Sequence, residues 1–310
     1  MQTMLSVVVP VYNEEESLLS FYEVLLKNLS RIGTPYEIVF VDDGSGDKTL
    51  KILKEFEAKN KAVKVYSLQK HEGKSEAMTV GFQKAIGDLI VTLDADLQDR
   101  PEEIKNLIKK QKEGYDLVSG WRKDRKDSFF KVFMSRFFNL TTRIFWGLRL
   151  HDYNSGLKLY STHAAKSLNL YGGLHRFIPV LVFQNGFSVT EIPVAHSARK
   201  LGKSKYPKLK ILTEMPDYFT ILFLSKFSKR PLHFFGFIGG TMLFIGFLIL
   251  VYLSIVWLGG ESIGRRPLLT FGVLLFLAGI QIFFTGFVAD LLINLNKEKD
   301  SSYPLKYQSK

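Results

Sequence analysis

Two aspartates separated by one residue follow a short apolar segment directly, and this arrangement narrows what the chain can fold into. Residues 89–93 are apolar or β-branched, which predicts a buried strand that ends at Asp94 and Asp96. Side chains two residues apart on an extended chain point the same way, so these carboxylates repel each other unless a hard cation such as Mg²⁺ or Mn²⁺ lies between them and a phosphate. A solvated turn or a helix N-cap is the alternative interpretation.

The first 120 residues alternate apolar segments with helical patterns, which predicts an α/β fold with a mostly parallel sheet. The expected strands are 5–9, 36–41, 63–68 and 89–93, and the expected helices between them are 15–29, 48–58 and 75–85. Polar residues follow the first strand at Tyr12 and Glu14 and the second strand at Asp42 and Asp43. Because parallel strands end at the same sheet edge, we expect these residues to lie near Asp94.

Composition excludes several classes of protein. The 310 residues carry a net charge of +12, from 42 Lys and Arg against 30 Asp and Glu, which favours phosphorylated partners or an anionic membrane surface. The sequence has no zinc-finger spacing, RNA-binding sheet motif or basic zipper, so we expect no nucleic acid partner. The absence of cysteine excludes disulfides and thiolate metal sites. No basic, apolar signal peptide begins the chain, so we expect the amino-terminal part to be cytoplasmic.

Two long apolar segments near the carboxyl end predict a transmembrane hairpin. Residues 231–258 and 267–295 are each long enough to cross a hydrocarbon core of about 30 Å. Basic residues before the first segment and after the second outnumber the two arginines of the intervening loop, which places both ends of the hairpin inside the cell. The sequence thus predicts a multi-pass protein of the cell membrane. A buried helical pair inside a soluble protein is the alternative.

Two further segments combine aromatic and basic residues and are predicted to be interfacial. In 129–148, phenylalanines recur near helical spacing beside lysine and arginine, which is typical of a helix in a lipid headgroup layer. A helix packed on the sheet has the same pattern, and that alternative stays open. Residues 207–230 repeat the theme and would run along the bilayer as a juxtamembrane segment.

Basic residues that could bind phosphate come after the predicted strands in the sequence. Residues 196–210 contain several basic residues and no acid, among them Arg199, Lys203 and Lys205 around Gly202, which suits a loop that folds over phosphate oxygens. A solvated tether to anionic lipid is the equally weighted alternative. Arg122 follows another apolar strand and is a candidate for the same site.

These motifs resemble the polyprenyl-phosphate sugar synthases of glycosyltransferase family 2. The resemblance covers residues 4–206 and rests on five segments, 9–14, 41–45, 94–99, 152–158 and 199–206, while the two-helix anchor is similar to that of bacterial bactoprenol glucosyltransferases. It implies a GT-A (Rossmann-like) domain over residues 1–206, a juxtamembrane segment at 207–230, a hairpin at 231–296 and a cytoplasmic tail at 297–310. Arg100 and the His71–Lys74 segment depart from the common pattern, and the second departure bears on sugar or base preference.

The resemblance also implies roles for individual residues. The nucleotide base and ribose would be held by Pro10, Tyr12, Glu14, Asp42 and Asp43. The metal and diphosphate would be addressed by Asp94, Asp96 and Gln98. Donor or acceptor phosphates would be met by Lys74, Arg122, Arg199, Lys203 and Lys205. Asp96, Arg122 and Asp152 are the expected catalytic residues, with Asp152 orienting acceptor or sugar rather than serving as an obligate base.

The expected reaction is metal-dependent, inverting transfer of a sugar from a nucleotide sugar to a polyprenyl (undecaprenyl) phosphate at the cytoplasmic membrane face. UDP-glucose is the predicted donor, with GDP-mannose as an alternative. A processive polysaccharide synthase is less compatible, because the sequence has no Gln-x-x-Arg-Trp motif and two predicted spans. A non-catalytic membrane scaffold is the alternative from another class of protein. The resemblance further suggests a homo-oligomer.

Overall fold

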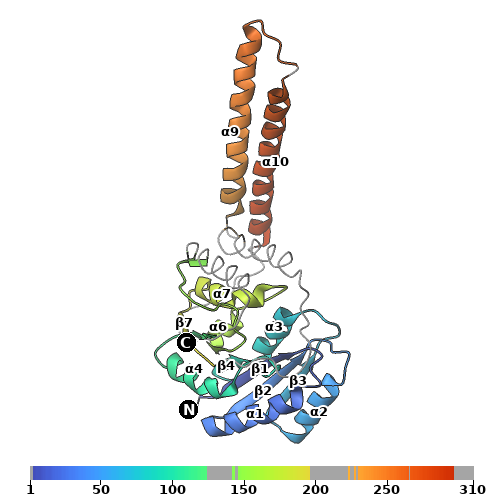
Figure 1. Cartoon of the computed structure of the whole chain (residues 1–310), viewed down its shortest axis with the longest axis vertical. Helices are drawn as coiled ribbons and strands as arrows, with labels where there is room; N and C mark the ends of the chain where they lie inside the picture. Colours follow the sequence, from blue (N-terminus) through green and yellow to red (C-terminus); the bar gives the residue numbers. More distant parts are fainter. Residues whose placement is uncertain are drawn as a thin grey trace. The chain divides into compact units, whose positions relative to one another are not determined.

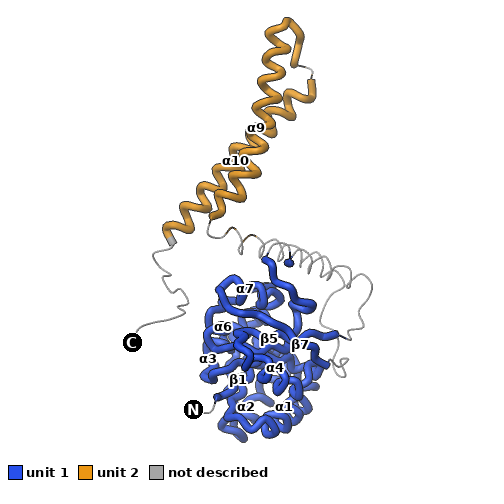
Figure 2. Tube along the Cα trace, turned by 90° about the vertical axis from the view of Figure 1, so that its left-hand side faces the viewer, with its two compact units in different colours: residues 1–217 blue, residues 218–310 orange. Residues whose placement is uncertain are grey.

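The computed structural model describes residues 3–123, 142–143, 146–195, 223, 227, 230–264 and 266–296. The chain divides into two units, Met1–Asp217 and Tyr218–Lys310, which Figure 2 colours separately. The predicted domain boundary at residue 206, most of the predicted interfacial helix at 129–148 and most of the 207–230 segment lie outside the described residues. These boundaries stay predictions.

A seven-stranded sheet in the order β3-β2-β1-β4-β6-β5-β7 forms the centre of the first unit (Figure 1). Strands β1 to β4 run parallel, and β6 pairs antiparallel with both β4 and β5, while β5 and β7 are parallel. The predicted mostly parallel sheet is therefore confirmed. The strands are β1 Leu5–Val11, β2 Tyr36–Asp42, β3 Val63–Ser67, β4 Leu89–Thr92, β5 Leu117–Trp121, β6 Lys158–Ser161 and β7 Val189–Pro193.

Helices cover both faces of this sheet, which explains why β1, β2 and β4 are largely apolar and buried along nearly their whole length, without the alternation of a half-exposed strand. One face packs against apolar side chains of α1, α2 and α4, and the other packs against α3, where the Phe82 and Tyr160 rings are 5.2 Å apart. The helices of the unit are α1 Leu18–Ile32, α2 Thr49–Lys59, α3 Lys74–Lys84, η1 Pro101–Glu103, α4 Ile104–Gln111, α6 Thr162–Lys166, η2 Leu174–Phe177 and α7 Ile178–Gln184.

Local sequence explains how the first crossover is built. In α1, Leu18, Phe21, Leu25 and Leu29 recur at helical spacing and are buried against the sheet. The helix ends at Gly33, whose φ of 70° favours glycine and whose N–H donates to the Leu29 carbonyl. Strand β2 then returns beside β1, with Leu5 opposite Tyr36 and Val11 opposite Asp42. This register brings the carboxyl ends of β1 and β2 to the same level.

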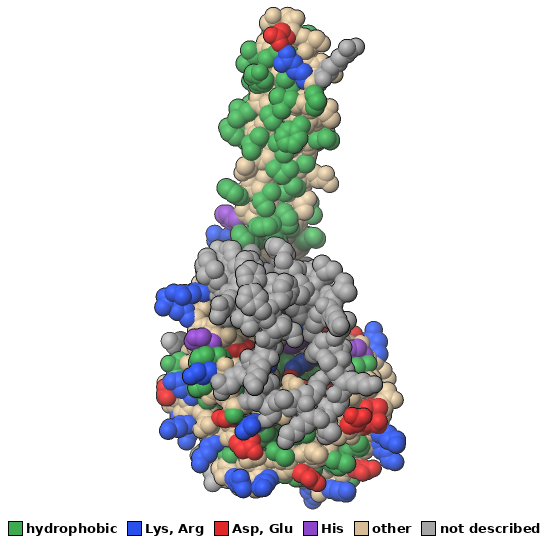
Figure 3. Space-filling view, in the orientation of Figure 1, with side chains coloured by type: hydrophobic (Ala, Val, Ile, Leu, Met, Phe, Trp, Pro, Cys, Tyr) green, Lys and Arg blue, Asp and Glu red, His purple; other side chains and the backbone are tan. Residues whose placement is uncertain are grey.

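The second unit contains the helical hairpin of α9 (Pro231–Leu258) and α10 (Pro267–Asn296). Both helices are long and apolar enough to span a membrane, and 11% of the most apolar window of each is buried, so they are not core helices of the unit. Figure 3 shows hydrophobic side chains along the visible surface of the hairpin. Glycines allow close packing of the helices: a Cβ on Gly279 would lie 2.5 Å from the Leu243 nitrogen.

Candidate functional site

The polar segments after β1, β2 and β4 meet at one edge of the sheet, as the sequence predicts. Two residues there have a left-handed backbone, Asn13 with φ 49° after β1 and Leu97 with φ 61° after β4. Among the described residues they are the only non-glycine positions with positive φ. Such conformations are costly for residues with a Cβ and cluster at functional sites. The backbone itself therefore marks this edge as the candidate site.

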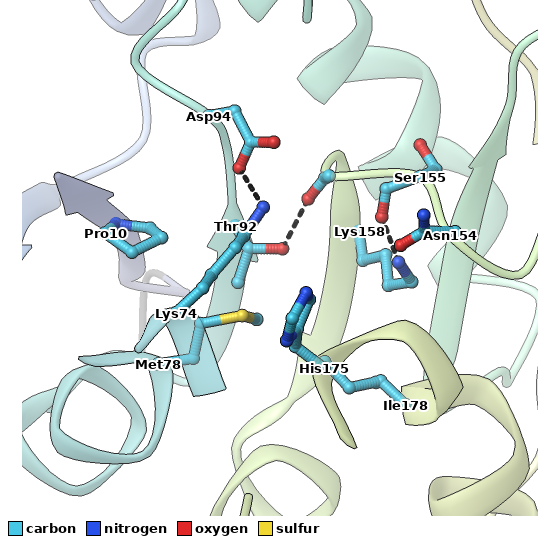
Figure 4. Close-up of a pocket in the computed structure, with 11 residues that line it drawn as sticks. Pro10, Lys74, Met78, Thr92, Asp94, Asn154, Ser155, Lys158, His175 and Ile178 are labelled. Atoms are coloured by element: carbon cyan, nitrogen blue, oxygen red, sulfur yellow. Dashed lines mark hydrogen bonds and ion pairs between the residues drawn. The ribbon is translucent and has the colours of Figure 1, made fainter. Parts of the chain in front are cut away.

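A pocket at this edge places a cation against the first aspartate of the β4 turn. Lys74, at the start of α3, holds its Nζ 2.5 Å from Asp94 Oδ1 (Figure 4). Burial raises the pKa of Asp94, but the charge and hydrogen bond of Lys74 outweigh that effect and the pKa lies below its usual value. Pro10, Thr92 and Gly156 also line the pocket, and the Thr92 hydroxyl donates to the Gly156 carbonyl over 2.8 Å.

A third carboxylate lies beside the pair and was not singled out from the sequence. Asp99 is 6% exposed, and burial together with the charge of Asp94 raises its pKa to about 7. A Cβ added to Gly156 would lie 2.5 Å from Asp99 Oδ2 and 2.8 Å from Asp94 Oδ2, so this position suits only glycine. The spacing Asp94, Asp96, Asp99 was a signal that could have identified the third acid.

This cluster suits a divalent cation, because it holds more carboxylate charge than its neighbouring cation offsets. Burial and, after it, the charge of Asp94 raise the pKa of Asp99. Within the described residues no group of three or more His, Asp or Glu side chains is arranged to hold a metal, so protein oxygens from Asp94 and Asp96 would need donor phosphates or water to complete the coordination. The Gln98 N–H donates to Asp96 Oδ1 over 3.1 Å and thereby orients that carboxylate.

The aspartates that end β2 are deeply buried and bind neighbouring backbone. Asp42 is 0% exposed and accepts hydrogen bonds from the Ser45 N–H at 3.2 Å and the Ser67 hydroxyl at 2.7 Å. Asp43 accepts from the Glu72 and Gly73 N–H groups, which precede α3. Both carboxylates thus shape the loops around the predicted base and ribose site.

An aromatic pair covers this same region. The Tyr12 and His71 rings stack with centroids 3.9 Å apart and an angle of 17° between their planes. His71 Nδ1 lies 2.8 Å from Asp43 Oδ2. Glu14, two residues beyond Tyr12, accepts a hydrogen bond from the Ser17 hydroxyl over 2.8 Å. His71, where the sequence departs from the common family pattern, is therefore in contact with Tyr12 and Asp43, two of the predicted donor-binding residues.

Arg122 and Asp152 form a bidentate ion pair. The sequence analysis named both residues but did not predict that they contact each other. Arg122 Nε lies 2.6 Å from Asp152 Oδ2, and Arg122 Nη2 lies 3.0 Å from Asp152 Oδ1. Both side chains are 11% exposed. Burial raises the pKa of Asp152, but the hydrogen bonds and charge of Arg122 bring it below its usual value. A carboxylate held this way is a weak base and a strong orienting group.

Glu191 of β7 anchors the loop that carries Asp152 and was missed by sequence reasoning. Its carboxylate accepts from the His151 N–H at 2.9 Å and the Asp152 N–H at 3.3 Å, and it also contacts the His151 ring. The His151 ring in turn stacks on Trp121 with centroids 4.2 Å apart. A single acid in a strand gives no sequence signal for this role, because its partners lie 39 or more residues away.

Two further side chains, the buried Lys158 and the partly buried His175, line the pocket and were also missed. Lys158 of β6 is 2% exposed, donates to the Ser155 carbonyl, and burial lowers its pKa to about 7. His175 of η2 lies 2.9 Å from the Ser75 hydroxyl through Nδ1, and burial lowers its pKa to about 3, so it is neutral at physiological pH. Figure 4 shows both side chains directed toward the pocket.

The described residues thus bring together most of the predicted site. Arg199, Lys203 and Lys205 lie outside the described residues, so the predicted phosphate loop stays a prediction.

Comparison with known proteins gives consistent matches. A profile described as "Glycosyl transferase family 2" matches residues 6–168. Dodecaprenyl-phosphate galacturonate synthase from Rhizobium johnstonii is 34% identical over 304 residues, covering 96% of this chain and 90% of the relative. Undecaprenyl-phosphate 4-deoxy-4-formamido-L-arabinose transferase from Pectobacterium carotovorum is 36% identical over 290 residues, covering 93% and 87%.

A solved structure shares the fold. Glucosyl-3-phosphoglycerate synthase from Mycobacterium tuberculosis, in complex with Mn²⁺, UDP and phosphoglyceric acid, superposes with a TM-score of 0.54 at 21% identity. The match covers 72% of this chain and 78% of that one. It agrees with the GT-A architecture described above.

Proposed function

The chain belongs to glycosyl transferase family 2 and is a glycosyltransferase, and from that premise we propose that it transfers a sugar from a nucleotide diphosphate sugar to a polyprenyl phosphate at the cytoplasmic face of a membrane. The observation that carries the proposal is the meeting of Asp94, Lys74, Lys158 and the Arg122–Asp152 pair at the carboxyl edge of the sheet. The names of two relatives that align over nearly the whole chain support the acceptor class.

The cations of the pocket suit a diphosphate leaving group. In the proposed reaction a phosphate oxygen of the acceptor forms a bond to the anomeric carbon, and the bond from that carbon to the diphosphate breaks, so its electrons pass to the nucleotide diphosphate. Lys74 would lie where that charge develops, and an approaching anion would favour the protonated form of Lys158, whose pKa burial lowers to about 7. In-line attack inverts the anomeric configuration.

A divalent ion, Mg²⁺ or Mn²⁺, held by Asp94 and Asp96 would supply further charge stabilisation to the diphosphate. Gln98 serves this site by orienting Asp96 through its N–H. Asp99 belongs to the same cluster, because its Oδ2 accepts a hydrogen bond from the Asp94 N–H over 3.4 Å.

No strong general base is needed for this acceptor. A phosphomonoester with a second pKa of about 6 is largely dianionic at neutral pH. Asp152 is already engaged by Arg122, so we infer that it orients Arg122 and the substrates instead of removing a proton. Arg122 would then face the acceptor phosphate or the sugar.

The base and ribose would bind beside Tyr12, bounded by Pro10, Glu14 and the loops that Asp42 and Asp43 hold in place. Arg199, Lys203 and Lys205 would close over the phosphates.

The membrane hairpin gives the enzyme access to its acceptor. A polyprenyl tail stays in the bilayer, so the soluble donor has to be brought to the headgroup plane. Helices α9 and α10 would cross the cell membrane with the catalytic unit in the cytoplasm, as the distribution of basic residues favours.

The sugar is the least constrained part of the proposal. UDP-glucose is the predicted donor and GDP-mannose the alternative, and the relatives are named for galacturonate and 4-deoxy-4-formamido-L-arabinose. A pocket discriminates sugars by its shape and by individual hydrogen bonds, so residues outside the shared motifs decide between them.

The test uses purified full-length protein with undecaprenyl phosphate and radiolabelled nucleotide donors of these four sugars, each with Mg²⁺, Mn²⁺ or EDTA. We expect one label to enter the organic phase in the presence of a metal, with inverted anomeric configuration. Absence of transfer from every donor, in protein shown to bind UDP, would contradict the proposed reaction.

A further inference from the structure

One polar side chain lies at the midpoint of an otherwise apolar helix. Gln281 is fourteen residues from either end of the apolar segment Pro267–Leu295, which places it about 21 Å along the helix from both ends. Across residues 234–258 and 267–289 of the hairpin, no other amide, acid, lysine, arginine or histidine occurs. In a hydrocarbon core of about 30 Å, Gln281 would therefore lie near the centre, too deep to reach a headgroup.

Gln281 faces away from the other helix of the hairpin. Gly272, Gly279 and Gly286 recur every seven residues and pack against α9: added Cβ atoms would lie 2.7 Å, 2.5 Å and 2.7 Å from α9 atoms. Gln281 follows Gly279 by two residues, which is about 200° around the helix. Its side chain is accordingly exposed, together with Leu277 and Phe284 on the same face.

This amide has no hydrogen-bond partner within the part of the hairpin that the structure describes. The Thr285 hydroxyl donates to the Gln281 backbone carbonyl over 2.8 Å, and no protein group meets the side-chain amide. In water an exposed Gln is ordinary, but in hydrocarbon each unsatisfied amide group costs several kcal/mol. A membrane-spanning α10 therefore requires a partner for Gln281, and the described residues of the chain provide none.

We propose that Gln281 is a contact between two copies of this chain inside the bilayer. The inference rests on the membrane placement under the proposed function, and it goes further by naming the face of α10 and the residue that pair. A glutamine amide carries both a donor and an acceptor, so it is complementary to itself across a two-fold axis. Two copies that insert with the same orientation place their Gln281 side chains at equal depth in the bilayer. An unrelated membrane protein need not have a polar side chain at that depth.

The lipid substrate does not meet the same requirement. A polyprenyl chain is hydrocarbon and offers no hydrogen-bonding group, and its phosphate lies at the headgroup plane, roughly 15 Å from the bilayer centre. The second copy is therefore the occupant that the chemistry selects for this face.

The natural absence of cysteine makes a direct test possible. In proteoliposomes of the full-length protein, Gln281→Cys introduces the only thiol, and Phe244→Cys is its matched control. Phe244 is near the midpoint of α9 and is 60% exposed, so it has similar depth and access but belongs to an apolar face. Mild oxidation should cross-link Gln281→Cys into a dimer far more efficiently than Phe244→Cys.

A second measurement tests the hydrogen bond itself. Fluorescence energy transfer between labelled copies, recorded as the liposomes are diluted with lipid, gives the strength of self-association. Gln281→Leu should weaken association about tenfold, whereas Gln281→Asn, which keeps the amide, should stay within about threefold of the natural protein. The proposal requires both results. Equal cross-linking of the two cysteine variants, or unchanged association of the leucine variant, overturns it.

Sugar transfer in the same proteoliposomes separates this inference from the proposed function. Transfer by the natural protein without preferential cross-linking at residue 281 refutes the contact alone. Preferential cross-linking in a protein that transfers no sugar refutes the proposed reaction and leaves the contact in place.

Discussion

The Arg122–Asp152 pair should behave as one unit, which a double-mutant cycle can measure. Three hydrogen bonds hold the guanidinium: 2.6 Å and 3.0 Å to the Asp152 carboxylate and 3.1 Å to the Asn154 carbonyl. Both charged groups are 11% exposed, so removing one leaves the other poorly solvated. Breaking such a pair costs about 3–5 kcal/mol, and the remaining exposure favours the lower end.

We expect Arg122→Met and Asp152→Asn each to lower the free energy of unfolding by about 3 kcal/mol. The double variant should lose no more than either single variant, because it leaves no unpaired charge, which gives a coupling energy of at least about 3 kcal/mol. Denaturant unfolding of the detergent-solubilised full chain, followed by tryptophan fluorescence, measures this, since Trp121 directly precedes Arg122.

The exposed Lys110–Glu113 pair, with side chains 28% and 54% accessible, is the matched control and should show no measurable coupling because solvent screens it. Additive effects of the Arg122 and Asp152 substitutions, within about 0.5 kcal/mol, would refute the reasoning.

The same variants also test the role of Asp152 in catalysis. If Asp152 only orients Arg122, the pH profile of the residual transfer by Asp152→Asn keeps its shape, whereas loss of an acidic limb would identify a general base.

Three further predictions concern other parts of the catalytic unit. Glu191→Gln should lower kcat about tenfold with the donor KM unchanged, because it loosens the loop that positions Asp152; steady-state kinetics that show an equal rise in KM would contradict this role. Relative to Lys158→Met, the natural protein should gain unfolding free energy as pH rises from 7 to 9, by up to about 1.4 kcal/mol per pH unit. The reason is that the folded pKa of Lys158, about 7, lies below the unfolded value of 10.5, so the unfolded chain binds more protons in that window. A difference between the two proteins that does not change with pH would count against a buried amine. Gly81→Ala should destabilise by about 1–3 kcal/mol, because its Cβ would meet Val8 Cγ1 on the sheet, while Gly46→Ala, with open space around it, serves as the control in the same unfolding assay.

Much of the fold could be predicted from the sequence, because three of the first four strands are largely apolar segments and helical segments separate all four. The structure extends the first strand to Val11 and the second to Asp42 and ends the fourth at Thr92, but it keeps every predicted element of this half. Strands β6 and β7 were not predicted. β6 begins with Lys158, a residue that strand patterns do not favour in a buried position, and its burial depends on neighbours far away in the sequence.

The candidate site also contains residues that the sequence identifies and contacts that only the structure reveals. Residues that directly follow apolar strands, such as Tyr12, Asp43 and Asp94, are identifiable because parallel strands end at a common edge. The ion pair of Arg122 and Asp152 joins residues 30 positions apart, and no spacing rule indicates it. Pairings of this kind depend on how loops pack in three dimensions, so they become visible only in the structure.

The central claim is that Asp94 and Asp96 bind a divalent ion together with the donor diphosphate. The most direct test is Mn²⁺ binding to the full-length protein, followed by electron paramagnetic resonance with and without UDP. The natural protein should bind Mn²⁺ more tightly when UDP is present, Asp96→Asn should lose that enhancement, and Asp88→Asn, which alters a carboxylate at the opposite end of β4, should keep it. Mn²⁺ binding that is the same in the natural protein and Asp96→Asn, whether or not UDP is present, would contradict the claim.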